Sequence, residues 1–177
     1  NTCHEFVAPL FVNEGTHCGA IPAAVPHSRA VPVLGLESQD GLLRGDIQPG
    51  PTGLMQVPAA AVSVIDMAVA ESGLPTLGYF AQVPHYVSGE YPAAAVALIR
   101  AVEQHLDDKL TTAVLELEAR GVHARLDTAS AADDSTKSYI TRLEEMADEA
   151  RLPSGEELIG EIERFLRDGG SDSGPIH

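Results

Sequence analysis

The sequence contains no tryptophan, only two cysteines and few aromatic residues, and it is poor in basic side chains. Its 11 lysines and arginines stand against 26 aspartates and glutamates, which gives a formal net charge of −15. A surface of this sign repels the phosphates that dominate affinity for nucleic acids, and it repels the headgroups of anionic lipids. We therefore expect no nucleic acid and no membrane among the partners.

Long hydrophobic runs and targeting signals are also lacking. No apolar run approaches the ~20 residues that a membrane-spanning helix needs, and the first residues show no basic segment followed by an apolar one. Cys3 and Cys18 stand far apart without neighbouring ligands, so they form neither a zinc motif nor a redox motif. We expect a cytoplasmic protein whose cysteines have no chemical role.

What the sequence does contain is typical of a folded protein. Hydrophobic residues make up 44% of the chain and charged residues 21%, and 177 residues suffice for one domain with a small appendage. The first 58 residues carry many prolines and short apolar stretches, which predict short strands at Phe6-Val7, Leu10–Val12 and Ala30–Leu36. The glycine- and proline-rich interval 37–52 predicts an exposed, mobile loop.

The middle of the chain has the pattern helix, strand, helix. Apolar residues recur at helical spacing from Ala59 until Ser72-Gly73, and a short buried strand is predicted over Thr76–Val83. Pro92 can open the next helix, which continues to Leu106. We expect its apolar stripe to be Val96, Ile99, Val102 and Leu106. This alternation favours an α/β layered fold.

The last third of the chain is acidic and helical in pattern. Helical spacing predicts helices over Lys109–Arg120, with an apolar stripe of Leu110, Val114 and Leu117, and over Thr136–Arg151. A further helix is predicted over Gly155–Arg167, because Ser154 and Glu157 have the spacing of a capping box. We predict an α/β domain over residues 1–107, a helical extension over 108–168 and a disordered tail over 169–177.

Two Val-Pro-His segments, Val25-Pro26-His27 and Val83-Pro84-His85, are the most distinctive motif. Proline fixes its own φ and restrains the preceding residue, so each segment directs a histidine away from a strand end. Ligands collect at strand ends of α/β sheets, which makes a common pocket one interpretation. Its candidate ligand-binding residues are His27, Arg29, His85, Tyr86 and Tyr91. The alternative is architectural, with imidazoles bonded to backbone carbonyls at loop starts.

Other motifs of catalysis are absent from the sequence. There is no His-Glu-x-x-His pair, no Gly-x-Ser-x-Gly elbow and no glycine-rich phosphate loop, and His17 and His123 stand alone. We predict no catalytic residue, no metal site and no cofactor, and enzymatic activity is less favoured than its absence. The acidic helices offer a docking face for a basic partner, although such faces are commonly just solvated.

The order of several short segments resembles the proteasome-assembly-chaperone (PAC2-like) family as it occurs in actinobacteria. The matching segments are Gly19-Ala20-Ile21-Pro22, Val25-Pro26-His27-Ser28-Arg29, Val83-Pro84-His85-Tyr86-Val87, Tyr91-Pro92-Ala93, Tyr139-Ile140-Thr141-Arg142-Leu143 and Leu152-Pro153-Ser154-Gly155. The resemblance implies a three-layer α/β/α domain similar to phosphorylases and hydrolases, with an all-helical C-terminal extension. Family members typically begin with a strand and a tryptophan-containing loop, so we expect the N-terminal part of the family domain to be absent here.

The same resemblance guides the functional prediction. Eukaryotic relatives help to build the proteasome α-ring, and the family supplies no agreed catalytic residues to carry over. We predict a non-enzymatic, assembly-chaperone-like or protein-interaction protein that forms a homo-oligomer such as a trimer and binds a protein client. The alternative is a small-molecule protein or enzyme that holds an anionic or nucleoside-like ligand between the two Val-Pro-His segments.

Overall fold

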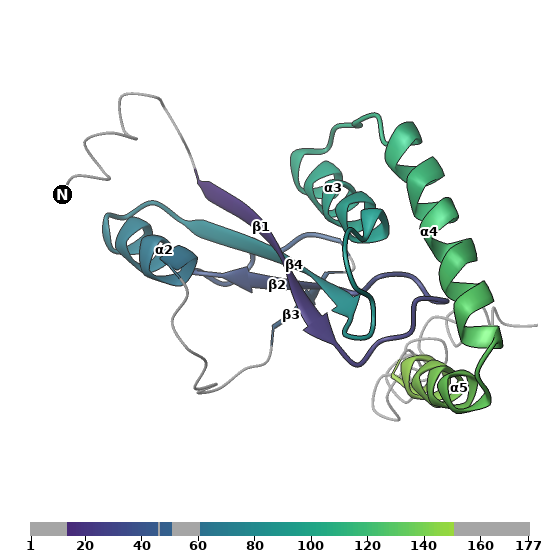
Figure 1. Ribbon diagram of the computed structural model, residues 1–177. Coiled ribbons are helices and arrows are strands. Elements are labelled where there is room, and N and C mark those ends of the chain that lie inside the picture. The colour runs from purple at the N-terminus through teal and green to yellow at the C-terminus, as the bar shows by residue number, and fades with distance from the viewer. Residues whose placement is uncertain (1–13, 46, 51–60, 151–177) are drawn as a thin grey trace, which may run out of the picture.

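The computed structural model of this protein describes residues 14–45, 47–50 and 61–150. Its centre is a mixed sheet with helices on both sides, which confirms the predicted α/β/α arrangement (Figure 1). The strands are β1 (Gly15–Ala23), β2 (Val33–Glu37), β3 (Gln48–Pro49) and β4 (Thr76–Pro84), and they lie in the order β1-β4-β2-β3. β1 runs parallel to β4, whereas β2 pairs with β4 in the antiparallel sense.

Strand β4, which the sequence predicted, carries the hydrophobic core. Its first residues are buried, and the Leu77 and Tyr79 side chains are fully enclosed. They pack with Ala101 of the helix that follows β4, and partly buried side chains from the β2 region surround them. A central strand covered by neighbours has a continuous apolar run, which explains why this element could be recognised from its composition.

Strand β1 was not predicted as an element, because all of its half-buried positions except Ile21 carry glycine, alanine or histidine. Its register with β4 places His17 opposite Gly78 and Gly19 opposite Phe80. A Cβ atom at Gly78 would lie 2.6 Å from the His17 ring, and one at Gly19 would lie 2.9 Å from the Phe80 ring. Each glycine therefore makes room for the ring on the neighbouring strand.

The interval 37–52 was predicted as a mobile exposed loop. In the part that the structure describes, it forms a strand and contributes side chains to the core. It contains β3, and Leu42, Leu43 and Ile47 pack against the core. The Glu37 carboxylate accepts hydrogen bonds from the backbone N–H groups of Leu42 and Leu43, at 2.7 and 2.8 Å. Those bonds lower the pKa of Glu37 and fix the turn.

Helices α2 (Ala61–Glu71) and α3 (Pro92–Leu106) confirm two predicted helices. Pro92 occupies the first turn of α3, where its missing N–H costs nothing. The predicted stripe of α3 is wrong at its end: Leu106 is 60% exposed, while Ala101 and His105 are buried. The buried residues of α3 are thus Ala94, Val96, Ala101 and His105, of which only Val96 belongs to the predicted stripe.

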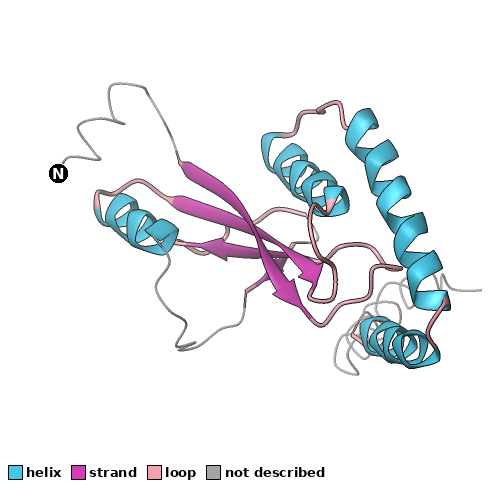
Figure 2. Cartoon of the chain, viewed as in Figure 1, coloured by secondary structure: helices cyan, strands magenta, loops and turns pink. Residues whose placement is uncertain are grey.

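Two further helices, α4 (Ala113–Ala131) and α5 (Asp134–Glu149), lie beyond one end of the sheet (Figure 2). Helix α4 has no buried residue, and Val114 and Leu117 of its predicted apolar stripe are 71% and 64% exposed. Helix α5 buries Ile140 and Leu143 and begins after Asp133, whose carboxylate accepts the Thr136 N–H. No helix among the described residues is long and apolar enough to cross a membrane.

Several predictions fall on residues outside the described ranges. These are the strands at Phe6-Val7 and Leu10–Val12, the helix over Gly155–Arg167 and the tail over 169–177. The domain boundaries also stay predictions.

Candidate functional site

The site lies where the parallel strands β1 and β4 end together. The register pairs Ala23 with Pro84, the last residues of the two strands. The loops that follow therefore leave the sheet at the same edge: His85 comes directly after β4, and Val25-Pro26-His27 follows the end of β1 after one intervening residue. This shared exit brings His27 and His85 to one side of the molecule, each in ring contact with Tyr86, at 5.8 and 5.6 Å between centroids.

His27 is the buried centre of this group, with 2% of its surface exposed. The Tyr86 hydroxyl lies 2.8 Å from the His27 backbone nitrogen, whose N–H it accepts, and 2.8 Å from the ring Nδ1. Burial raises the pKa of Tyr86, so this hydroxyl stays protonated. One phenol thus fixes both the backbone and the ring of His27.

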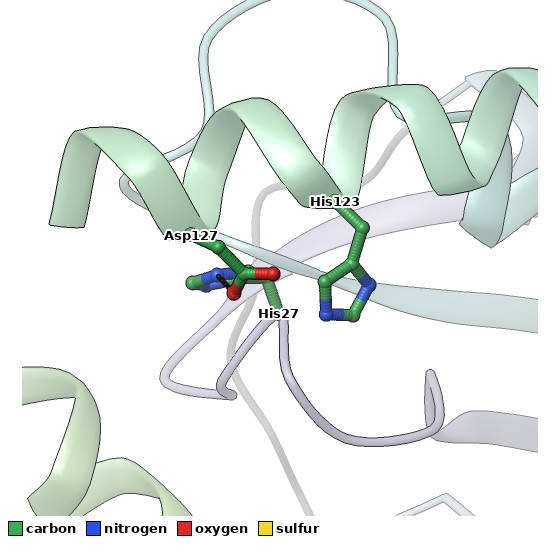
Figure 3. A group of neighbouring side chains, drawn as sticks. All are labelled: His27, His123 and Asp127. Carbon is green, nitrogen blue, oxygen red and sulfur yellow. Dashed lines mark hydrogen bonds and ion pairs between the residues drawn. The ribbon is translucent and has the colours of Figure 1, made fainter. Parts of the chain in front are cut away.

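The Nε2 edge of the His27 ring points toward helix α4. Nε2 lies 3.2 Å from Oδ1 of Asp127, and the ring centroid lies 5.3 Å from that of His123. Because a carboxylate only accepts, Nε2 carries the ring proton in this pair, and the Tyr86 hydroxyl donates to Nδ1. Figure 3 shows His123 and Asp127 projecting from one helix toward His27. One donor atom from each of the three lies within 4.8 Å of the others, a spacing that could hold a metal ion.

The next two residues connect the same loop to helix α5. The Ser28 hydroxyl donates to the Glu144 carboxylate, and the Arg29 guanidinium donates to both oxygens of Asp148, at 2.9 and 2.8 Å. The Asp148 carboxylate is the main cause that raises the pKa of Arg29. Three consecutive residues, His27, Ser28 and Arg29, therefore contact helices α4 and α5, and we call them the anchor segment.

His85 is exposed and has an architectural contact. Its Nδ1 lies 3.1 Å from the backbone oxygen of Ala23, and its Nε2 lies 3.3 Å from the Tyr139 hydroxyl. A carbonyl only accepts, so Nδ1 is the protonated nitrogen and Tyr139 of α5 donates to Nε2. The bond to Ala23 is the kind that the alternative interpretation of the Val-Pro-His segments predicted.

Tyr91, the fifth predicted residue, precedes helix α3 and is partly buried. Burial, with a smaller contribution from Tyr86, raises the pKa of Tyr91 to about 12.

This shift predicts a loss of stability at high pH. The unfolded chain releases the Tyr91 proton near pH 10, whereas the folded chain holds it until about pH 12. The free energy of unfolding therefore decreases as the pH rises from about 10 to about 12. Ultraviolet titration of phenolate absorbance should show one tyrosine fewer ionising near pH 12 in Tyr91→Phe. An unchanged curve at that pH would contradict the assignment.

The structure brings some of the predicted site residues together. His27, His85 and Tyr86 meet, and Arg29 lies beside them with its guanidinium on Asp148 rather than in an open pocket. The prediction missed His123, Asp127, Tyr139, Glu144 and Asp148. His123 and Asp127 stand four residues apart on a helix, which was the available signal. The ligand pocket stays a prediction.

Comparisons with known proteins give the site its context. The family model described as the PAC2 family matches residues 4–130, most of the chain. The chain belongs to the PAC2 family. The match includes all three residues of the His27, His123 and Asp127 group, as well as Tyr86. No protein among the curated ones matches the chain.

Several solved structures share the fold, and one of them is of a PAC2 family protein. A Corynebacterium glutamicum protein of unknown function is 28% identical, with a TM-score of 0.75, over 84% of this chain and 55% of its own. A PAC2 family protein from Streptomyces avermitilis is 28% identical, with a TM-score of 0.68, over 78% of this chain and 58% of its own. A Mycobacterium tuberculosis proteasome-assembly chaperone homologue is 29% identical, with a TM-score of 0.66 and the same coverages. The chain thus spans somewhat more than half the length of these relatives.

Proposed function

We propose that this PAC2-family protein is a non-enzymatic, oligomeric, assembly-chaperone-like protein of the cytoplasm that works through protein–protein contacts. Two findings support this proposal: one relative of known structure is a proteasome-assembly chaperone homologue, and the residues at the strand ends are bonded to the chain's own helices. Side chains used in this way stabilise a fold and are not free to act on a substrate.

The observation that carries the proposal is an exposed apolar surface at the start of α4. Leu106, Leu110, Val114 and Leu117 have 60%, 49%, 71% and 64% of their surface exposed. We call these four residues the α4 apolar surface. Scattered apolar residues are normal on a protein surface. Here Leu106 ends α3, Leu110 lies in the connection to α4, and Val114 and Leu117 lie one turn apart on α4. Exposed apolar residues gathered in this way along one stretch of chain are typical of a contact with another chain. The occupant we propose is a second copy of this chain, which would make the homo-oligomer.

Two substitutions in the α4 apolar surface, Val114→Gln and Leu117→Gln together, should weaken self-association. Glutamine keeps the helix and the charge but removes apolar area from the contact. We expect the wild-type chain to sediment as an oligomer and the double variant to shift to the monomer at the same concentration. Sedimentation velocity over a range of concentrations measures this shift.

A matched control lies on the same helix. Glu118→Gln with Arg120→Gln also introduces two glutamines at exposed positions and leaves the net charge unchanged, so its oligomer should be that of the wild type.

The chaperone role itself is tested by adding purified proteasome α-type subunits of the same organism: a complex should form with the wild-type and control chains. A monomeric wild-type chain that binds no α-type subunit would refute the proposal.

A further inference from the structure

We propose that His27, His123 and Asp127 bind one divalent transition-metal ion, with Zn²⁺ as the preferred metal, and that the ion fixes helix α4 to the end of strand β1. Two imidazole nitrogens and one carboxylate oxygen form a donor set that suits Zn²⁺ and disfavours Mg²⁺ and Ca²⁺, which prefer oxygen ligands.

The spacing between the donor atoms fits such an ion. With metal–ligand bonds of roughly 2.0–2.2 Å, two ligands of a tetrahedral site stand roughly 3.4 Å apart. Nε2 of His27 and Oδ1 of Asp127 are 3.2 Å apart, close to that separation. All three donor atoms lie within 4.8 Å, so a rotation of the partly exposed His123 side chain would complete the site. Asp127 is 60% exposed, which leaves water access to the fourth position.

The Tyr86 hydroxyl, which lies at Nδ1 of His27, also suits metal binding by Nε2 of the same ring. When Nε2 binds a metal, the ring proton moves to Nδ1, which then donates to the Tyr86 hydroxyl at the observed 2.8 Å. A metal-binding histidine generally donates its other N–H in this way, which fixes the ring orientation. His27 is therefore held as a ligand before the metal arrives, since its backbone N–H is bonded to the same hydroxyl.

The position of the site gives the ion a structural consequence. Helix α4 has no buried residue, so little apolar packing holds it in place. His123 and Asp127 lie one turn apart on its inward face, and His27 and Asp127 are 100 residues apart in the chain. An ion shared by all three would cross-link the helical extension to the sheet and stabilise the folded chain, because it binds a site that the unfolded chain lacks.

The test begins with the metal-free wild-type chain, prepared with a chelator. Calorimetric titration with Zn²⁺ should show one ion bound per chain, and Co²⁺ should give the intense visible absorption of four-coordinate cobalt. Mg²⁺ should give no signal at the same concentration. Saturating Zn²⁺ should raise the thermal midpoint by about 5 °C or more.

Two variants and two matched controls assign the binding to this site. His123→Gln and Asp127→Asn should each raise the Zn²⁺ dissociation constant by about 100-fold or more, since loss of an outer partner alone costs 10–100-fold. Glu118→Gln and Asp134→Asn remove exposed carboxylates of α4 and α5 that lie outside the group, and should bind as the wild type does. Circular dichroism verifies the fold of every variant. The proposal would be overturned if the wild type bound no Zn²⁺, or if His123→Gln and Asp127→Asn bound Zn²⁺ as tightly as the wild type does.

Discussion

Leu77→Ala is expected to destabilise the protein by about 2–5 kcal/mol, the range for a buried leucine whose removal leaves a cavity. Leu77 is fully enclosed on the central strand β4 and packs in the same cluster as Tyr79 and Ala101. The sheet is narrow in the described part of the chain, so few neighbours can move to fill the space. Urea denaturation followed by circular dichroism measures the change.

Ile65→Ala is the matched control for this prediction. It also removes a branched aliphatic side chain, but Ile65 is 58% exposed on α2, and its truncation should change the free energy of unfolding by no more than about 0.5 kcal/mol. Equal losses at the two positions would show that the core is not centred on β4.

His27→Ala is expected to have the second large effect, a loss of about 2–4 kcal/mol measured in the presence of a chelator. The substitution empties a buried position and removes the ring that bonds to the Tyr86 hydroxyl and the Asp127 carboxylate, although the backbone N–H at residue 27 still reaches Tyr86. His85→Ala is the control, because that ring is exposed; we expect about 1 kcal/mol or less. Similar losses for both histidines would mean that the two Val-Pro-His segments are equivalent, contrary to the structure.

The sequence was sufficient to predict those helices and strands whose pattern of apolar residues reflects their surroundings in the fold. Strand β4 has a continuous apolar run because both of its neighbours are strands, and α3 begins at a proline that only a first helical turn accommodates. Strand β1 could not be predicted in this way. Its half-buried positions are Gly15, His17, Gly19, Ile21 and Ala23, and their fit depends on Phe80 and Gly78 of a strand far along the chain.

The stripe on α4 shows a second limit of periodicity. Spacing indicates that Val114 and Leu117 share a helix face, but it does not indicate whether that face is buried in the chain or exposed.

The site could be predicted only in part from the sequence. His123 and Asp127 are one turn apart and visible as a pair, yet only the parallel pairing of β1 with β4 brings His27 to them. The resemblance to the family identified the fold; it did not indicate this contact.

Amide hydrogen exchange in His27→Ala, read by mass spectrometry, tests most directly whether the anchor segment holds the helical extension on the strand ends. The wild-type chain should protect amides of α4 and α5, where His27, Ser28 and Arg29 make their contacts. The account predicts that the variant loses protection in α4 and α5 by a larger factor than in β4. Equal loss in all three elements, or unchanged protection in the two helices, would contradict it.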